Sequence, residues 1–200
     1  MNIRIFRIAS LAALALLALV ALAWQWGLLP SSDKGGSGTG IARVGGPFAL
    51  IDQDGQPRTE KDYAGKLMLI YFGFTYCPDV CPTALQVMST ALQTLGPEAS
   101  KIQPIFITVD PARDTPAQLK TYVGNFFPGM VGLTGSEEAI KKTADAYRVY
   151  FRKAADGSAT EYLMDHSSIV FLMDRKGRYV SHFTHQTPPE KMAAVIREHL

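Results

Sequence analysis

LMLIYFGFTYCPDVCP, residues 67–82, joins a continuous apolar run to two closely spaced cysteines. The apolar part, Leu67 to Phe74, is typical of a central strand that is buried on both faces. Beyond the cysteines, Pro82 to Leu95 repeats apolar residues at helical spacing and stops at Gly96-Pro97, so this segment predicts a helix. Cys77 and Cys81 therefore lie between a buried strand and the helix that follows it.

The rest of the chain alternates strands with helices. A hairpin is expected at Phe48–Ile51 and Arg58-Thr59, with Asp54-Gly55 as its turn. Further strands are predicted at 102–109, 168–173 and 179–183, and further helices at 116 to about 127, at 136–147 and at 188–200, the first two capped by Thr115 and Ser136. This order is that of an α/β thioredoxin-like fold, a central mixed sheet flanked by helices. Reactive thiols in this fold lie where Cys77 and Cys81 are found.

Charge excludes one class of partner. The 200-residue chain has 20 basic and 18 acidic residues, and Arg4 and Arg7 near the N-terminus account for the difference. From Pro30 onward the two signs balance. Because a neutral domain lacks the basic surface that nucleic acids require, we expect no nucleic-acid partner.

The N-terminal 29 residues predict a transmembrane anchor. Ile8 to Leu29 has no charged residue, follows two arginines, and carries Trp24 and Trp26 where an interfacial aromatic belt would lie. A cleaved signal peptide is the alternative, because Ala21-Leu22-Ala23 fits the small-x-small cleavage rule. Both interpretations export the domain. We therefore expect a single-pass protein of a bacterial-type inner membrane, with the C-terminal domain in the periplasm or an equivalent compartment.

The segment after the anchor predicts a flexible tether. Residues 31–40 read SSDKGGSGTG, a composition typical of a linker. We therefore divide the chain into an anchor or signal at 1–29, a linker at 30–46 and a thioredoxin-like domain at 47–200.

The two cysteines are better suited to chemistry than to stapling the fold. They are the only cysteines in the chain and lie four residues apart, so a disulfide between them would close a very short loop. Each precedes a proline, which disfavours helical dihedrals at Cys77 and Cys81. We therefore expect the helix to begin at Pro82 with Cys81 as its N-cap, where the helix dipole favours a thiolate.

Two thiolates on one turn form a soft metal site. Such ligands select Cu(I), zinc or iron–sulfur iron, but a structural zinc site needs four ligands and the chain has no further cysteine. One histidine would complete a three-coordinate Cu(I) site, and an added weak ligand would allow Cu(II). His166 is the candidate, since its loop faces the cysteines in a thioredoxin fold. His182 and His185 form an alternative ligand pair.

An ordinary redox dithiol is the competing interpretation of Cys77 and Cys81. Thioredoxin-type oxidoreductases have two residues between their cysteines and a cis-proline before the hairpin strand. This chain has three residues between them, and His166-Ser167 occupies the position of that proline. Both departures favour a metal site. Redox chemistry remains open, because an exported dithiol can oxidise to a disulfide, which does not bind copper.

The motifs together resemble the Sco/SenC family of copper chaperones for cytochrome c oxidase assembly. The resemblance runs in order from about Pro47 to the C-terminus. The matching segments are FGFTYCPDVCP at 72–82, VDPARDTP at 109–116, YRVY at 147–150, DHS at 165–167 and DRKG at 174–177. The segment Asp110 to Pro116 is expected to shape a surface loop rather than to bind metal, with a docking role as the alternative.

The resemblance implies a metallochaperone rather than an enzyme. It implies one copper held by Cys77, Cys81 and His166, an upstream copper donor, and delivery to the binuclear copper centre of cytochrome c oxidase subunit II. Reduction of that subunit's cysteines would be an accessory activity. Asp79 and Asp165 are expected to tune the site without binding the ion. A membrane-anchored thiol-disulfide oxidoreductase, or a redox or copper sensor, is the alternative function.

Overall fold

The computed structural model describes residues 44–154 and 162–200, together with residues 17, 19 and 22 of the N-terminal segment. The chain separates into two compact units, Met1–Ile41 and Ala42–Leu200, and all elements below belong to the second. The expected anchor and linker lie almost wholly outside the described residues, so their boundaries remain predictions. Among the residues that are described, no helix combines the length and the apolar character needed to cross a bilayer.

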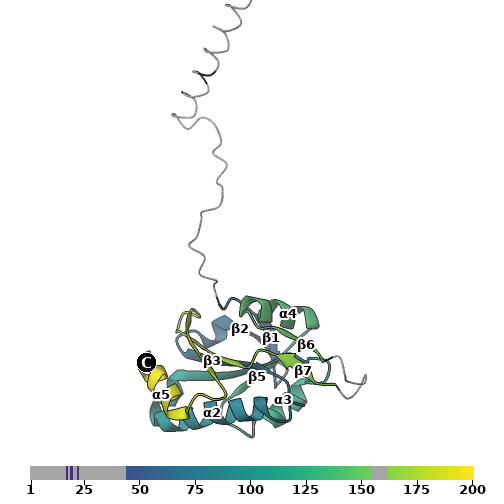
Figure 1. Cartoon of the computed structure of the whole chain (residues 1–200), viewed down its shortest axis with the longest axis vertical. Helices are drawn as coiled ribbons and strands as arrows, with labels where there is room; N and C mark the ends of the chain where they lie inside the picture. Colours follow the sequence, from purple (N-terminus) through teal and green to yellow (C-terminus); the bar gives the residue numbers. More distant parts are fainter. Residues whose placement is uncertain (1–16, 18, 20–21, 23–43, 155–161) are drawn as a thin grey trace, which may run out of the picture. The chain divides into compact units, whose positions relative to one another are not determined.

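A seven-stranded mixed sheet forms the centre of the domain (Figure 1). Its strands are β1 (Ala49–Asp52), β2 (Pro57–Thr59), β3 (Leu67–Gly73), β4 (Ile102–Thr108), β5 (Val131–Thr134), β8 (Ile169–Met173) and β9 (Tyr179–Thr184). They are ordered β2-β1-β5-β4-β3-β8-β9, with β3, β4 and β5 parallel and the other pairs antiparallel. The predicted thioredoxin-like α/β domain with a mixed sheet is therefore confirmed.

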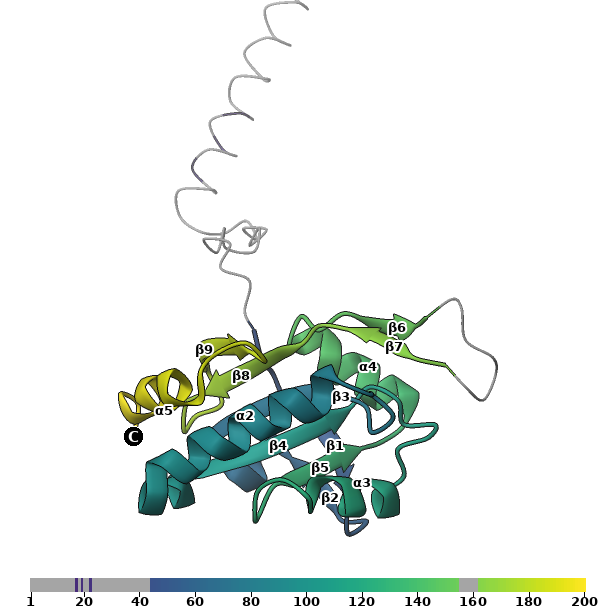
Figure 2. The same cartoon turned by 60° about the horizontal axis from the view of Figure 1, so that its bottom comes forward.

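Helices cover both faces of this sheet. They are α2 (Val80–Leu95), α3 (Pro116–Val123), α4 (Glu137–Ala146) and α5 (Pro189–Arg197), with short 3-10 helices at Glu60–Tyr63 and Gly96–Lys101. Figure 1 shows α4 on one side of the sheet and α2, α3 and α5 on the other, and Figure 2 shows α5 beside α2. Thr115 and Ser136 cap α3 and α4 as expected, each accepting a hydrogen bond from the backbone N–H three residues on.

The apolar run at 67–74 is continuous because β3 lies in the middle of this arrangement. It pairs with β4 on one side and β8 on the other, and all seven of its residues are buried. Burying one large aliphatic side chain such as Leu69 or Ile70 stabilises a fold by about 1.5 to 3 kcal/mol. The strand is therefore a rigid base for the loop that follows it, which carries Cys77.

The helix that carries Cys81 begins earlier than predicted. It starts at Val80 with Asp79 as its N-cap, so Cys81 is the second helical residue and not the cap. Pro82 falls in the first turn, where a backbone N–H has no acceptor within the helix and its absence costs nothing. A residue that precedes proline is usually not helical, yet Cys81, which precedes Pro82, is helical here. Its side chain is 0% exposed, so burial accompanies this conformation. The predicted N-cap position of Cys81 is wrong.

Two further predictions about elements were incomplete. Helix α3 ends at Val123 and not near Phe127, with Gly124 as its C-cap. The short strand β5 and a separate two-stranded sheet, β6 (Phe151–Lys153) with β7 (Met164–His166), were not predicted at all. His166 therefore ends a strand and does not lie in a loop. We call β6 and β7 the histidine ribbon.

Candidate metal centre

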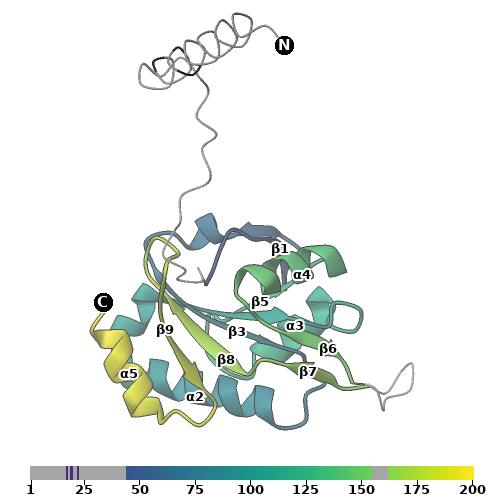
Figure 3. The same ribbon diagram turned by 45° about the horizontal axis from the view of Figure 1, so that its top comes forward.

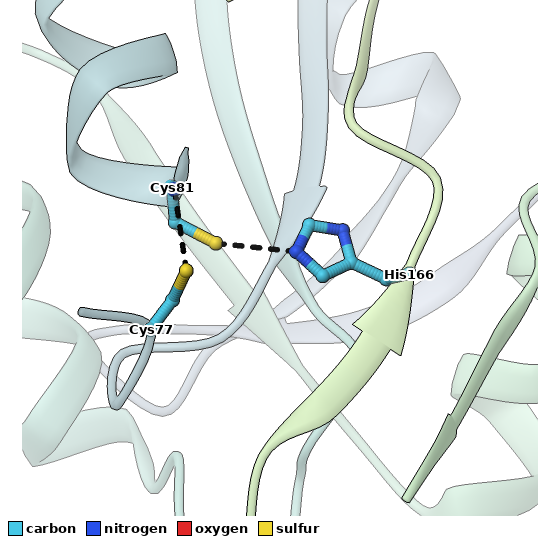
Figure 4. A group of neighbouring side chains, drawn as sticks. All are labelled: Cys77, Cys81 and His166. Atoms are coloured by element: carbon cyan, nitrogen blue, oxygen red, sulfur yellow. Dashed lines mark hydrogen bonds between the residues drawn. The ribbon is translucent and has the colours of Figure 1, made fainter. Parts of the chain in front are cut away.

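The side chains of Cys77, Cys81 and His166 converge in the structure (Figure 4). Cys77 lies in the loop Thr75–Asp79, which we call the cysteine loop, and Cys81 lies in the first turn of α2. Their sulfurs and a ring nitrogen of His166 all lie within 4.8 Å of one another. No other group of three or more His, Cys, Asp or Glu side chains in the described part of the chain is arranged to share a metal ion.

Hydrogen bonds give each potential ligand a defined orientation. The backbone N–H of Cys81 donates to Cys77 Sγ at 3.3 Å, and His166 Nε2 lies 3.4 Å from Cys81 Sγ. His166 Nδ1 lies 3.3 Å from the carbonyl oxygen of Ser167. A carbonyl only accepts, so Nδ1 carries the proton and Nε2 presents its lone pair towards the sulfurs. This tautomer leaves Nε2 ready to bind a metal.

Two aromatic rings position the imidazole. Tyr71 and Phe74 meet the His166 ring edge-on, with centroid distances of 6.1 and 5.8 Å and interplanar angles of 80° and 90°. Edge-to-face pairs of this kind are favourable and directional. The sequence indicated both residues only as members of a buried strand, since neither has a chemical group that marks a metal site.

The two thiols differ in acidity. A hydrogen bond from the Cys81 thiol, with smaller contributions from the N–H groups of Asp79 and Cys81, lowers the pKa of Cys77 to about 4 despite partial burial. The pKa of Cys81 is raised, first because it donates to Cys77 and second because it is buried. The direction of the two shifts is the reverse of the expectation from the helix dipole, because the less buried Cys77, and not Cys81, is the more acidic thiol.

This difference predicts selective alkylation of Cys77 in mild acid. The rate of reaction with iodoacetamide follows the thiolate fraction, so it should stay nearly constant from pH 8 to about pH 5 and fall by half near pH 4. Mass spectrometry of the labelled peptides measures the rate at each cysteine. In Cys81→Ala, which lacks the main hydrogen-bond donor, the curve should shift to higher pH. A tenfold rise in rate per pH unit between 6 and 8 in the unaltered chain would contradict the assignment.

Gly73 leaves room for the sulfur of Cys81. A Cβ at this position would lie 2.9 Å from Cys81 Sγ, 2.9 Å from Tyr71 Cε1 and 3.0 Å from Phe106 Cε2. We expect Gly73→Ala to lower the free energy of unfolding by about 1 to 3 kcal/mol through overpacking, and to weaken metal binding by displacing Cys81. Chemical denaturation and metal titration measure the two effects. Gly135→Ala, whose Cβ would meet Leu50 Cδ2 at 3.2 Å outside the centre, should leave metal binding unchanged.

The spacing of the donors suits a small soft ion. First-row metals bind sulfur at about 2.3 Å and imidazole nitrogen at about 2.0 Å, which keeps two such ligand atoms about 3.5 to 3.7 Å apart at tetrahedral to trigonal angles. The observed 3.4 Å between Cys81 Sγ and His166 Nε2 is close to this range. Two sulfurs and one imidazole are also ligands that Cu(I) favours.

A family model described as SCO1/SenC matches residues 37–200. The chain belongs to the SCO1/SenC family. It is 42% identical over 156 residues to an SCO2-like protein of Rickettsia conorii, covering 78% of this chain and 76% of the relative. Among solved structures, it is similar to Bradyrhizobium japonicum ScoI with copper bound, at 46% identity and a TM-score of 0.73, covering 78% of this chain and 99% of that one. Copper-bound yeast Sco1 has 42% identity and a TM-score of 0.73, with coverage of 78% and 88%.

The other two carboxylates considered at the SCO1/SenC site point elsewhere. Asp79 Oδ1 accepts a hydrogen bond from Thr83 at 3.4 Å, and Asp165 forms an ion pair with Arg152 at 3.0 Å. Both side chains are exposed. Asp79 reaches the cluster through its backbone N–H, which contributes to the low pKa of Cys77.

The remaining histidines lie away from the cluster. His182 Nδ1 is 2.6 Å from the hydroxyl of Tyr179, on the edge strand β9. His185 follows β9 and is half-buried, and His199 is exposed after α5. No described acidic or sulfur ligand joins His182 and His185 in a metal-binding group. The structure thus brings together the three ligands chosen from the sequence and none of the alternatives.

The segment Asp110 to Pro116 forms a partly exposed loop with Thr115 as the cap of α3, as expected, but its two aspartates are buried. Asp110 is 2% exposed and Asp114 is 0% exposed. Asp114 accepts hydrogen bonds from Thr75 in the cysteine loop and from Thr108 at the end of β4. The charged residues of this SCO1/SenC motif are therefore directed inward, behind the metal centre, and the sequence contains no pattern that distinguishes an inward carboxylate from a capping one.

Proposed function

We propose that this chain is a copper chaperone for cytochrome c oxidase assembly, with Cys77, Cys81 and His166 as the copper ligands. The preassembly of two sulfurs and one imidazole nitrogen within 4.8 Å carries this proposal. The copper bound in solved structures of family members at 46% and 42% identity supports the choice of metal. The resemblance of the motifs supports delivery to the binuclear copper centre of subunit II, with reduction of that subunit's cysteines as an accessory activity.

Uptake follows from the acidity and exposure of the ligands. Cys77 is half-exposed and already a thiolate at neutral pH, so it meets an incoming Cu(I) first. Cys81 then loses its proton to solvent as it binds, and His166 Nε2 supplies its lone pair without a change of tautomer.

Release follows the opposite path. Cys81 is buried, whereas Cys77 and His166 are half-buried, so an acceptor thiolate reaches the ion from the side of these two residues. A three-coordinate ion accepts a fourth ligand before it loses one, which allows stepwise ligand exchange. A structural zinc cage with four protein ligands offers no such open position.

The location of the domain completes the proposal. The segment 1–29 anchors the chain in a bacterial-type inner membrane, and the linker 30–46 lets the periplasmic domain reach both an upstream copper donor and the membrane-bound oxidase. The apolar sequence of 8–29 and its two preceding arginines support this topology. A fusion of alkaline phosphatase after residue 200 should be active if the domain is exported and inactive if it is cytoplasmic.

Loss of the gene tests the biological role. A deletion strain should lose cytochrome c oxidase activity and regain it when copper is added to the medium or when the unaltered gene is returned. A gene encoding Cys77→Ser and Cys81→Ser together should fail to restore activity in low copper. Full oxidase activity in the deletion strain at limiting copper would argue against an assembly role.

A thiol-disulfide oxidoreductase is the second candidate, favoured by the low pKa of Cys77 beside a second thiol. His166→Ala separates the two functions. A copper chaperone loses metal affinity on this change, whereas a dithiol exchanger keeps most of its rate with a small disulfide substrate. An unchanged affinity for Cu(I) with a lost exchange rate would favour the oxidoreductase.

A further inference from the structure

The histidine ribbon is not part of the seven-stranded sheet, as Figure 3 shows (β6 and β7). A lone two-stranded ribbon is only marginally stable in water. The position of His166 therefore depends on how each end of β7 is attached to the domain. After His166 the chain enters the main sheet at Ile169 of β8. Before it, buried side chains attach β7 to the domain, among them Met164 and Tyr162.

Tyr162 lies four residues before His166 and is buried. Its hydroxyl donates a hydrogen bond to Asp110 Oδ1 at 2.7 Å. The guanidinium carbon of Arg113 lies 3.7 Å from the centre of its ring, and Lys153 Nζ lies 4.5 Å from the same centre. The upstream end of the ribbon is thus held by the segment Asp110–Asp114, which we call the 110–114 loop.

The same loop holds the cysteine loop. Asp114 accepts hydrogen bonds from the backbone N–H of Thr75 at 3.0 Å and from its hydroxyl at 2.6 Å. The guanidinium carbon of Arg113 lies 4.6 Å from the ring centre of Tyr76, the residue immediately before Cys77. The 110–114 loop therefore contacts both segments that supply ligands, through Asp110, Arg113 and Asp114.

Within the 110–114 loop, the side chain of Arg113 touches both segments. It lies between the rings of Tyr76 and Tyr162, and its Nε donates to Asp110 Oδ2. Its side chain is only 15% exposed, and its buried Nη2 has no hydrogen-bond partner. Aromatic faces stabilise a desolvated guanidinium, which explains how this nitrogen is tolerated. A lysine, without a planar group to stack on two rings, cannot replace these contacts.

We propose that the 110–114 loop fixes the separation between the cysteine loop and the histidine ribbon, with Arg113 as the positioning residue, so that the metal-free chain keeps its three ligands within binding distance. The proposal rests on the proposed function, since it takes Cys77, Cys81 and His166 as the ligands. It assigns to the 110–114 loop a role in the affinity for copper although none of its residues binds the ion.

Arg58 supplies a matched control for Arg113. It forms an ion pair at 2.7 Å with Asp52, which is 2% exposed, so it too is an arginine paired with a buried carboxylate. This pair belongs to β1 and β2, at the edge of the sheet away from β3. Arg113→Met and Arg58→Met each remove the positive charge and leave an unbranched apolar side chain in place of the arginine.

Competition with a Cu(I) chelator measures the affinity of the reduced full chain. We expect Arg113→Met to weaken Cu(I) binding by about 10- to 100-fold, as changes behind metal ligands commonly do, and Arg113→Lys to restore only part of the loss. Arg58→Met should stay within about twofold of the unaltered chain even where its loss of thermal stability is similar. Should Arg113→Met fail to fold, Tyr162→Phe, which removes only the hydroxyl bonded to Asp110, should weaken binding severalfold.

A double-mutant cycle that combines Arg113→Met with His166→Ala shows whether Arg113 affects Cu(I) affinity through the position of His166. If Arg113 acts by holding the ribbon against the cysteines, Arg113→Met should cause less than about a twofold further loss once His166 is gone. An undiminished loss in that background would overturn the proposal, as would equal effects of Arg113→Met and Arg58→Met. If His166→Ala alone leaves Cu(I) affinity unchanged, the ligand set of the proposed function is wrong.

Hydrogen exchange of the metal-free chain decides the positioning role without copper. Arg113→Met should speed exchange of backbone amides in β6, β7 and residues 75–79 by about tenfold or more, and leave β3 and β4 protected. Arg58→Met should leave all these segments unchanged. Equal protection of the ribbon in the unaltered chain and in Arg113→Met would contradict the proposal.

Discussion

Replacing Cys77 or Cys81 by serine is expected to lower the affinity of the chain for Cu(I) by about 100- to 1000-fold, or about 3 to 4 kcal/mol. Serine keeps the size of the side chain but substitutes a hard oxygen for a soft thiolate, which Cu(I) binds poorly. His166→Ala should cost less, about 10- to 100-fold, because two thiolates can still hold the ion in linear geometry. Competition with a Cu(I) chelator under reducing conditions measures all three changes.

Exposed histidines outside the cluster provide the control for this series. His182 and His199 are both exposed, and neither belongs to a metal-binding group in the structure. His182→Ala and His199→Ala should therefore bind Cu(I) as the unaltered chain does. A larger loss for His182→Ala than for His166→Ala would show that the wrong histidine has been assigned.

Oxidation is expected to abolish copper binding completely and reversibly. Two thiols form the Cys77–Cys81 disulfide by giving two electrons and two protons to an added oxidant such as oxidised glutathione, and a disulfide has no thiolate to bind Cu(I). The oxidised chain should bind less than about one-hundredth of the copper that the reduced chain binds, and a phosphine reductant should restore the full amount. Metal analysis after gel filtration gives the stoichiometry of each form.

The two cysteine thiols already lie close together in the reduced structure. Both thiols are free, and their sulfurs lie within the 4.8 Å cluster. Cys77→Ser cannot form the disulfide, so oxidant should not change its residual copper binding. An oxidised chain that still binds one equivalent of Cu(I), with the disulfide confirmed by mass spectrometry, would disprove the thiolate assignment.

The sequence was sufficient to predict the elements that present the cysteines. Burial of β3 on both faces requires the continuous apolar run at 67–74, and burial of one face of α2 requires the helical spacing at 82–95. Both patterns can therefore be seen in the sequence. The hairpin of β8 and β9 and the caps Thr115 and Ser136 were also predicted, because turn and cap residues act through local hydrogen bonds. The three converging ligands followed from their chemistry and their order along the fold.

Features that depend on contacts between distant segments could not be predicted from local patterns. The first turn of α2 includes Cys81 although Pro82 follows it, and His166 ends a strand that pairs only with β6. The inward direction of Asp110 and Asp114 likewise depends on Tyr162 and Thr75, which are far from them in the chain. The acidity of Cys77 depends on the thiol that lies against it, a contact between side chains that the helix dipole at Cys81 does not predict.

X-ray absorption of the reduced chain loaded with Cu(I), combined with metal analysis, tests the shared copper site most directly. We expect one copper per chain, bound by two sulfurs at about 2.3 Å and one imidazole nitrogen at about 2.0 Å. His166→Ala should remove the nitrogen and leave both sulfurs. A spectrum with sulfur ligands alone that does not change in His166→Ala, or a reduced chain that retains no copper, would contradict the account.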